Sequence, residues 1–185
     1  NFNSGWITRT SHLIFLNRTC FNGLFRVNSK GGFNVPHGDY KNPKICNQEN
    51  LMAVSKIISN TDILCGNYTL SRDFIDDKTF VYFDPPYRPL NQTSSFTSYS
   101  KFDFTDKEQL ELAEYYKQVH ELGAKLLLSN SDPKNTNPDD NFFEDAYSDF
   151  DIRRVLATRA INSKASKRGK INELLVLNYN TNKVK

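Results

Sequence analysis

The sequence predicts an α/β fold, and three features of the chain indicate it. Short continuous apolar runs, typical of strands covered on both faces, occur at 61–65, 79–83, 125–129 and 173–179. An amphipathic stretch separates the second run from the third. Near residue 60, a part rich in Asn, Gly and aromatic residues gives way to one that alternates apolar and amphipathic stretches. We therefore predict two domains, 1–60 and 61–185.

The stretch between the second and third runs is predicted to be a helix because it carries start and stop signals. Thr105 is a good N-cap, and Glu108 completes a capping box with it. Gly123 is expected to cap the other end. One face follows at helical spacing and consists of Leu112, Ala113, Tyr116, Val119 and His120. Such a strand–helix–strand unit makes a right-handed crossover in a mainly parallel sheet.

The first domain is predicted to be small and mainly helical, with one β-hairpin. A short helix is expected at 11–17 and another at 48–59. The segment 24–36 indicates a hairpin whose arms are 24–27 and 33–35. Its connection, N-S-K-G-G, supplies residues that tolerate the positive φ of a tight turn.

Composition excludes several classes of function. The net charge of +3 permits a polyanionic partner without demanding one. No apolar run reaches the length that spans a membrane. Cys20, Cys46 and Cys65 lack metal-ligand spacing, and their odd number argues against a disulfide framework. We expect reduced thiols, no metal and no membrane.

The segment 80–87, F-V-Y-F-D-P-P-Y, ends an apolar strand in an acid, two prolines and a tyrosine. Prolines stop a sheet ladder, so Asp84 and Tyr87 are left at the edge where open α/β sheets bind ligands. An exocyclic amino group on a purine is a poor nucleophile, and acceptors for its two hydrogens would activate it. The Asp84 carboxylate and the Pro85 carbonyl can serve, while Tyr87 stacks on a base taken out of the duplex. The other interpretation is a plain strand-ending turn.

Two further segments suit nucleic acid, and each has an ordinary alternative. An arginine on a hairpin arm can fork onto guanine, and an aromatic at the tip can wedge between base pairs. That pattern occurs in 21–40, which is otherwise a solvated hairpin with Phe21 in a small core. The loop 163–170, S-K-A-S-K-R-G-K, suits phosphate contacts or is simply a solvated charged loop.

Taken together, these segments resemble the DNA adenine methyltransferases of the Dam type, which modify the adenine of GATC. Residues 16–36 are similar to the family's target-recognition hairpin, and D-P-P-Y (84–87) is similar to its catalytic motif. The resemblance continues through 94–113, L-L-S-N-S-D (127–132) and the block 158–179.

The resemblance implies a partial Rossmann-like methyltransferase sheet, with S-adenosylmethionine as methyl donor and double-stranded DNA as partner. It implies the catalytic residues Asp84, Pro85, Pro86 and Tyr87. It places Asp84, Asn67 and Tyr68 beside the cofactor. The implied DNA-binding residues are Phe21, Asn22, Leu24, Arg26, Pro36 and Tyr40, together with Lys164, Lys167 and Arg168 of the basic loop. Arg26 would read guanine.

The segments with which the family opens its catalytic domain have no counterpart in this sequence. We therefore expect the chain to be the C-terminal portion of such an enzyme, with most of the cofactor site in a preceding segment. We expect a monomer in the cytoplasm of a bacterium or encoded by a phage. Two other interpretations are a DNA-binding module without catalysis and an amino-methyltransferase acting on RNA or protein, which would have no reason to carry a duplex-reading hairpin.

Overall fold

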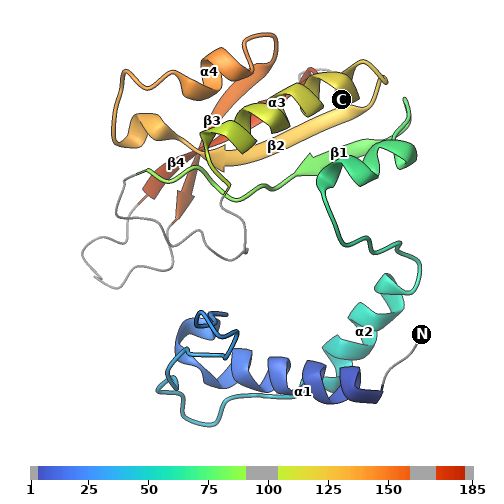
Figure 1. Cartoon of the computed structure of the whole chain (residues 1–185), viewed down its shortest axis with the longest axis vertical. Coiled ribbons are helices and arrows are strands. Elements are labelled where there is room, and N and C mark those ends of the chain that lie inside the picture. The colour runs from blue at the N-terminus through green and yellow to red at the C-terminus, as the bar shows by residue number, and fades with distance from the viewer. Residues whose placement is uncertain (1–3, 91–103, 159–169, 182–185) are drawn as a thin grey trace. The chain divides into compact units, whose positions relative to one another are not determined.

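The computed structural model describes residues 4–90, 104–158 and 170–181, and the chain divides into two compact units (Figure 1). The first unit is Asn1–Cys65 and the second is Gly66–Lys185. The resemblance implies DNA recognition by 1–60 and catalysis by 61–185, and both roles stay predictions.

The first unit is built on two helices. Helix α1 is Ser4–Thr19, far longer than the short helix predicted at 11–17, and a 3₁₀ turn, η1, follows at Phe21–Gly23. Helix α2 is Gln48–Ile58, which confirms the predicted second helix. The Asn47 side chain caps it by accepting from the Asn50 amide at 3.5 Å.

The predicted hairpin turn is present, but its arms are not regular strands. Gly31, with a φ of +78°, donates to the Asn28 carbonyl at 2.9 Å, and Asn28 donates to the Gly32 carbonyl at 2.9 Å. Beyond this turn the arms pair only as isolated bridges, Val27 with Phe33 and Cys20 with His37. A two-stranded ribbon with exposed arms has no third strand or core to regularise it.

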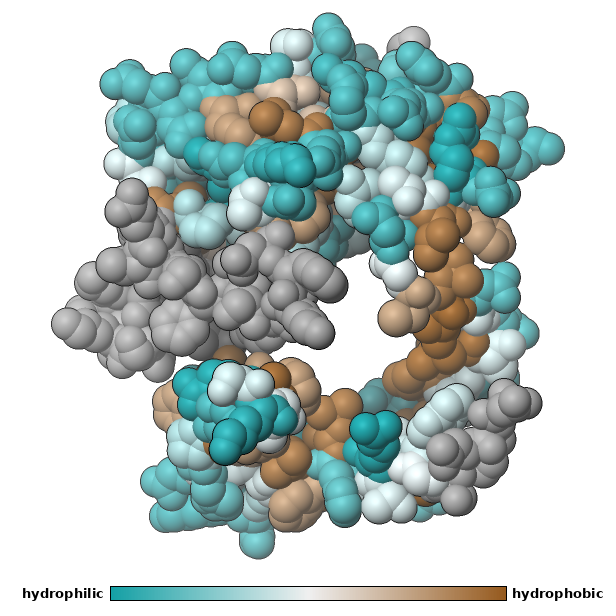
Figure 2. Space-filling view, viewed as in Figure 1, coloured by the Kyte–Doolittle hydropathy of each residue, from teal (hydrophilic) through white to brown (hydrophobic). Residues whose placement is uncertain are grey.

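The prediction of a strand at 61–65 is wrong. That segment is irregular, and its side chains Ile63 and Leu64 are 72% and 56% exposed. Short apolar runs do not identify a strand unless a neighbouring strand is available to pair with them. Figure 2 shows hydrophobic side chains gathered along α2 and the segment after it, which include Leu51, Met52, Val54, Ile57, Ile58, Ile63 and Leu64.

The second unit is built on a four-stranded mixed sheet in the order β1-β2-β4-β3. The strands are β1 (Phe80–Phe83), β2 (Lys125–Ser131), β3 (Asp151–Thr158) and β4 (Lys170–Leu177). Strands β1 and β2 are parallel, as predicted, but β4 runs antiparallel to both β2 and β3. The expectation of a mainly parallel sheet is therefore corrected, and β3 was not predicted at all.

Helix α3, Asp106–His120, connects β1 to β2 and covers one face of the sheet (Figure 1). Its predicted capping box forms, with Thr105 and Glu108 exchanging hydrogen bonds. The helix ends before Gly123, whose φ of +86° makes the turn into β2. The predicted apolar face is buried except for one residue, since His120 is exposed and contacts Asn178 at 2.9 Å from its Nδ1.

Aromatic residues fill the core of this unit. Tyr116 of α3 is fully buried, and the rings of Phe83, Tyr147 and Phe150 lie within 5.4 Å of its centroid. Among its described residues the unit also contains the short elements η2 (Tyr68–Phe74), η4 (Pro133–Asn135) and α4 (Phe142–Ala146). Within the described ranges, no helix has the length and apolar character needed to cross a membrane.

Candidate functional site

The candidate site is the end of β1, where the D-P-P-Y turn (84–87) follows the buried ring of Phe83. Because β1 and β2 are parallel, the turn lies beside the carboxyl end of β2. This is the sheet edge at which the sequence predicted a ligand.

A cavity of about 550 Å³ opens at this edge, and it brings together residues far apart in the sequence. Its lining contains Asp84, Pro85 and Pro86 from the turn, and Asn67 and Tyr68 from the start of η2. The predicted catalytic and cofactor-binding residues therefore share one hollow, apart from Tyr87. A volume of this size is typical of small-molecule sites.

The lining of the cavity combines acidic and apolar side chains. Glu108 and Glu111 of α3 line it together with Leu112. Tyr68 packs its ring 5.1 Å from that of Tyr115. Burial raises the pKa of the Tyr68 hydroxyl, and the charge of Glu111 raises it further.

The Asp84 carboxylate is tied to the neighbouring strand. Ser129 of β2 lies 3.3 Å from Asp84 Oδ1 through its hydroxyl, and 2.9 Å from the Tyr82 hydroxyl. Tyr87 is half-buried. Burial raises the pKa of the Tyr87 hydroxyl, although a hydrogen bond with Ser129 acts against that rise.

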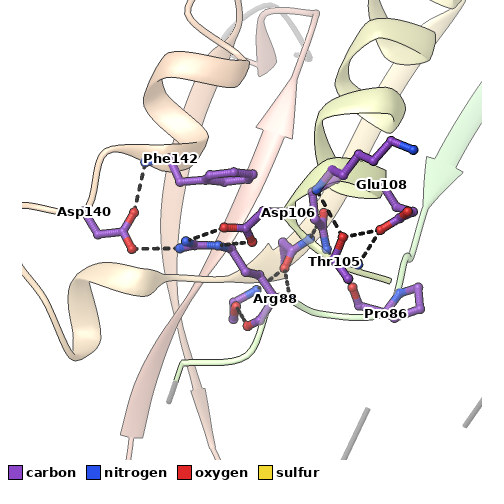
Figure 3. Close-up of polar contacts among 11 residues, drawn as sticks. Pro86, Arg88, Thr105, Asp106, Glu108, Asp140 and Phe142 are labelled. Atoms are coloured by element: carbon purple, nitrogen blue, oxygen red, sulfur yellow. Dashed lines mark hydrogen bonds and ion pairs between the residues drawn. The ribbon is translucent and has the colours of Figure 1, made fainter. Parts of the chain in front are cut away.

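The residue after the motif, Arg88, is anchored on three sides, as Figure 3 shows. Its Nε and Nη2 donate to Asp106 at 2.7 and 3.0 Å, and its Nη1 donates to Asp140 at 2.7 Å. Its guanidinium also lies 4.3 Å from the centre of the Phe142 ring. This anchor was not predicted from the sequence. Its one local signal was the arginine that directly follows the motif.

Two buried amides hold the backbone of the same turn. Gln109 of α3 donates to the Pro86 carbonyl at 2.8 Å, and Asn130 of β2 accepts from the Arg88 amide at 2.9 Å. Asn130 also donates to Gln109 at 3.1 Å, so the two side chains form one network. Sequence analysis did not single out either residue.

Replacing Arg88 by alanine is expected to cost about 1–3 kcal/mol of unfolding free energy at pH 7. Burial alone would raise the pKa of Asp140, but hydrogen bonds from Arg88 and the Phe142 amide lower it below its usual 3.8. A lowered pKa in the folded state means that this stabilisation is present above pH 3.8 and is lost as the pH falls through and below it. The loss caused by Arg88→Ala should therefore shrink between pH 6 and pH 3 in urea unfolding.

A matched control for this change is Arg153→Ala. Arg153 pairs with Asp151 at 2.6 Å, but both side chains are more than a third exposed. Exposed pairs contribute about 0–1 kcal/mol. Equal losses in the two variants at pH 7 would contradict the anchor.

The predicted DNA-binding residues of the first unit gather around one chain reversal. Phe21 is 47% exposed, and its amide donates to the Pro36 carbonyl at 2.8 Å. Asn22 has a φ of +54°, and Tyr40 is 44% exposed. Leu24 is half-buried.

Arg26 is exposed and held across the reversal by one residue. Its Nε donates to Asn34 Oδ1 at 2.9 Å, and its Nη2 donates to the Asn34 carbonyl at 2.8 Å.

Lys164, Lys167 and Arg168 lie outside the described residues. Among the residues that are described, His, Cys, Asp and Glu form no group of three that could hold a metal.

Comparison with models of known protein families assigns this chain to a family. Residues 6–161 match the model of the D12 class N6 adenine-specific DNA methyltransferases. The chain belongs to this family. The D12 assignment agrees with the resemblance that the sequence carried.

Curated relatives of the D12 chain are methyltransferases by name. It is 53% identical over 174 residues to the type II methyltransferase M.MjaIII of Methanocaldococcus jannaschii, with 94% of this chain and 58% of that protein covered. It is 42% identical over 175 residues to M1.LlaDCHI of Lactococcus lactis subsp. cremoris, covering 94% and 59%. It is 37% identical over 164 residues to the DNA adenine methylase of Escherichia coli K12, covering 89% and 56%. The D12 chain thus spans less than three-fifths of the length of these relatives.

Proposed function

We propose that the full-length protein is a site-specific DNA adenine methyltransferase that acts on GATC. It would transfer a methyl group from S-adenosylmethionine to the exocyclic amino group of a flipped adenine. The observation that carries the proposal is a cavity whose lining includes both Asp84 and Pro85 of the turn and Asn67 and Tyr68 at the start of η2.

The residues of the turn suit the activation of an amino group. The Asp84 carboxylate and the Pro85 carbonyl would accept its two hydrogens, which makes the nitrogen lone pair available. Tyr87 would stack on the flipped base and hold it in line with the methyl group. As the new N–C bond forms, the surplus proton of the amino group lies toward Asp84.

The cavity also suits the methyl donor. S-adenosylmethionine supplies an electrophilic methyl on a positively charged sulfur, which leaves as a neutral thioether. Asp84, Glu108 and Glu111 place negative charge around the hollow, which favours a bound cation. Asn67 and Tyr68 would border the adenine of the donor.

Radiolabelled transfer by the full-length protein tests this function. A duplex with one GATC should gain label as N6-methyladenine, whereas duplexes with single-base changes in that site should gain far less. Equal labelling of RNA or of protein would favour the other amino-methyltransferases. Specific GATC binding without transfer or donor binding in calorimetry would favour a recognition module.

Guanine reading by Arg26 is a separate prediction. Asn34 accepts hydrogen bonds from Nε and Nη2 of the guanidinium. The end that carries Nη1 is left to donate to the edge of a base. Arg26→Ala should therefore cost about 1–3 kcal/mol of discrimination at one guanine. Competition binding against single-base variants of the duplex measures it.

The hairpin tip offers the control. Lys30→Ala changes an exposed cation in the same reversal and should weaken binding to all sequences alike. An Arg26→Ala protein that keeps its full preference for GATC would rule out this role.

A further inference from the structure

Two consecutive residues at the end of β2, Ser129 and Asn130, are polar and almost completely buried, at 3% and 0% exposure. Neighbouring residues on a strand point to opposite faces of the sheet. The parallel register pairs Phe83 with Leu128, so the next position brings Asp84 level with Ser129. Buried polar groups need partners, and both residues find theirs in or beside the D-P-P-Y turn.

Ser129 engages the side chain of the turn's acid. A serine hydroxyl has one hydrogen, so if it donates to Asp84 Oδ1 it can only accept from the tyrosine hydroxyls beside it, those of Tyr82 and Tyr87. The chain Tyr82–Ser129–Asp84 then fixes the rotation of the carboxylate. Asp84 is itself exposed, so this contact leaves its carboxylate open to a substrate.

Asn130 engages the backbone of the turn from the other face. Prolines 85 and 86 have no amide hydrogen, so a sheet ladder cannot hold this part of the chain. Asn130 Oδ1 instead accepts from the Arg88 amide, and its Nδ2 binds Gln109, which donates to the Pro86 carbonyl. Hydrogen bonds therefore hold the backbone of the turn on both sides of Tyr87, at Pro86 and at Arg88 (both labelled in Figure 3).

We propose that Ser129 and Asn130, with Gln109, are positioning residues for methyl transfer. Ser129 sets the Asp84 carboxylate, and the amide pair sets the backbone that carries Pro85 and Tyr87. This inference rests on the proposed function. It differs from a purely structural role because it predicts a loss of transfer at temperatures where the variants are folded and bind DNA.

Single-turnover methyl transfer by the full-length protein, with DNA affinity measured in parallel, tests the serine. Ser129→Ala should slow transfer by about 10- to 100-fold, as misplacement of a reacting group does, and should leave the dissociation constant for DNA unchanged within a factor of about 2. Ser129→Thr keeps a hydroxyl and should restore most of the rate. Ser148→Ala removes an exposed hydroxyl in the turn after α4 and should have no effect.

The amide pair is tested by Gln109→Met, which keeps the length of the side chain but removes both hydrogen bonds. Val119→Ala is its matched control, because Val119 is fully buried on the same helix and lies far along it from the turn. Both variants should melt at lower temperature. Only Gln109→Met should slow transfer when each protein is assayed well below its melting temperature.

The outcomes separate the two proposals. If the unaltered protein transfers methyl to DNA and Ser129→Ala and Gln109→Met do so at its rate, the positioning role is overturned while the proposed function stands. Equal slowing by Gln109→Met and Val119→Ala would also overturn it, since the loss would then follow stability alone. An unaltered protein that transfers no methyl would overturn the proposed function, and this inference with it.

Discussion

Replacing Asp84 by alanine is expected to abolish methyl transfer by the full-length protein while leaving DNA binding largely intact. The carboxylate is the one charged acceptor in the D-P-P-Y turn, and it lines the cavity beside Pro85. Without it the amino group keeps its lone pair delocalised in the purine ring. Loss of one preorganised group at a reacting centre costs about 10²–10³-fold in rate, and an ionised group should cost at least that.

The experiment is a single-turnover assay on a GATC duplex, with DNA affinity measured in parallel. Asp84→Asn is the informative control, because its amide oxygen can still accept one hydrogen and should give an intermediate rate. Near-normal turnover by Asp84→Ala would remove the basis of the proposed mechanism. Loss of DNA affinity together with rate would point to a folding defect instead.

Replacing Tyr116 by alanine is expected to destabilise the second unit by about 3–5 kcal/mol, the usual cost of truncating a buried aromatic residue. The side chain is fully buried among the rings of the core. Its one hydroxyl hydrogen is shared between the carbonyls of Leu126 in β2 and Val176 in β4, each 3.3 Å from the oxygen. Urea unfolding followed by circular dichroism measures the loss.

Tyr116→Phe separates packing from the hydroxyl and should cost only about 0.5–1.5 kcal/mol. Burial raises the pKa of the Tyr116 hydroxyl above its ordinary 10.0. A raised pKa in the folded state means that its stabilisation is complete below pH 10 and falls as the pH rises above it. The phenylalanine variant should therefore lose less stability than the unaltered protein between pH 9 and pH 11. A Tyr116→Ala protein as stable as Tyr116→Phe would contradict the packing argument.

Local signals predicted the parts of the fold that depend on neighbours in sequence. Thr105 and Glu108 are three residues apart, so the start of α3 could be read directly. Strand β3 could not, because Arg153 and Arg154 interrupt its apolar pattern. Arg154 pairs instead with Asp132 at 2.9 Å and with Glu144, which are partners that the sequence places far away. The direction of β4 is likewise not encoded in an apolar run.

The candidate site divides in the same way. The D-P-P-Y motif predicted a site at the edge of the sheet. Asn67 and Tyr68, which the resemblance placed beside the cofactor, line the same cavity as Asp84. The supports of the turn were missed because each joins residues well separated in the chain. Gln109 is 23 residues from Pro86, and Asn130 is 42 residues from Arg88. Only the fold brings such pairs together.

The anchoring of Arg88 also decides how the surface around the turn meets a polyanion. Its guanidinium is neutralised by Asp106 and Asp140 and covered by Phe142, so it is not available to replace the counterions that DNA phosphates carry. The neighbouring groups Glu108 and Glu111 are acidic. If the protein binds DNA as proposed, the salt dependence of that binding is therefore expected to reflect other lysines and arginines and not Arg88.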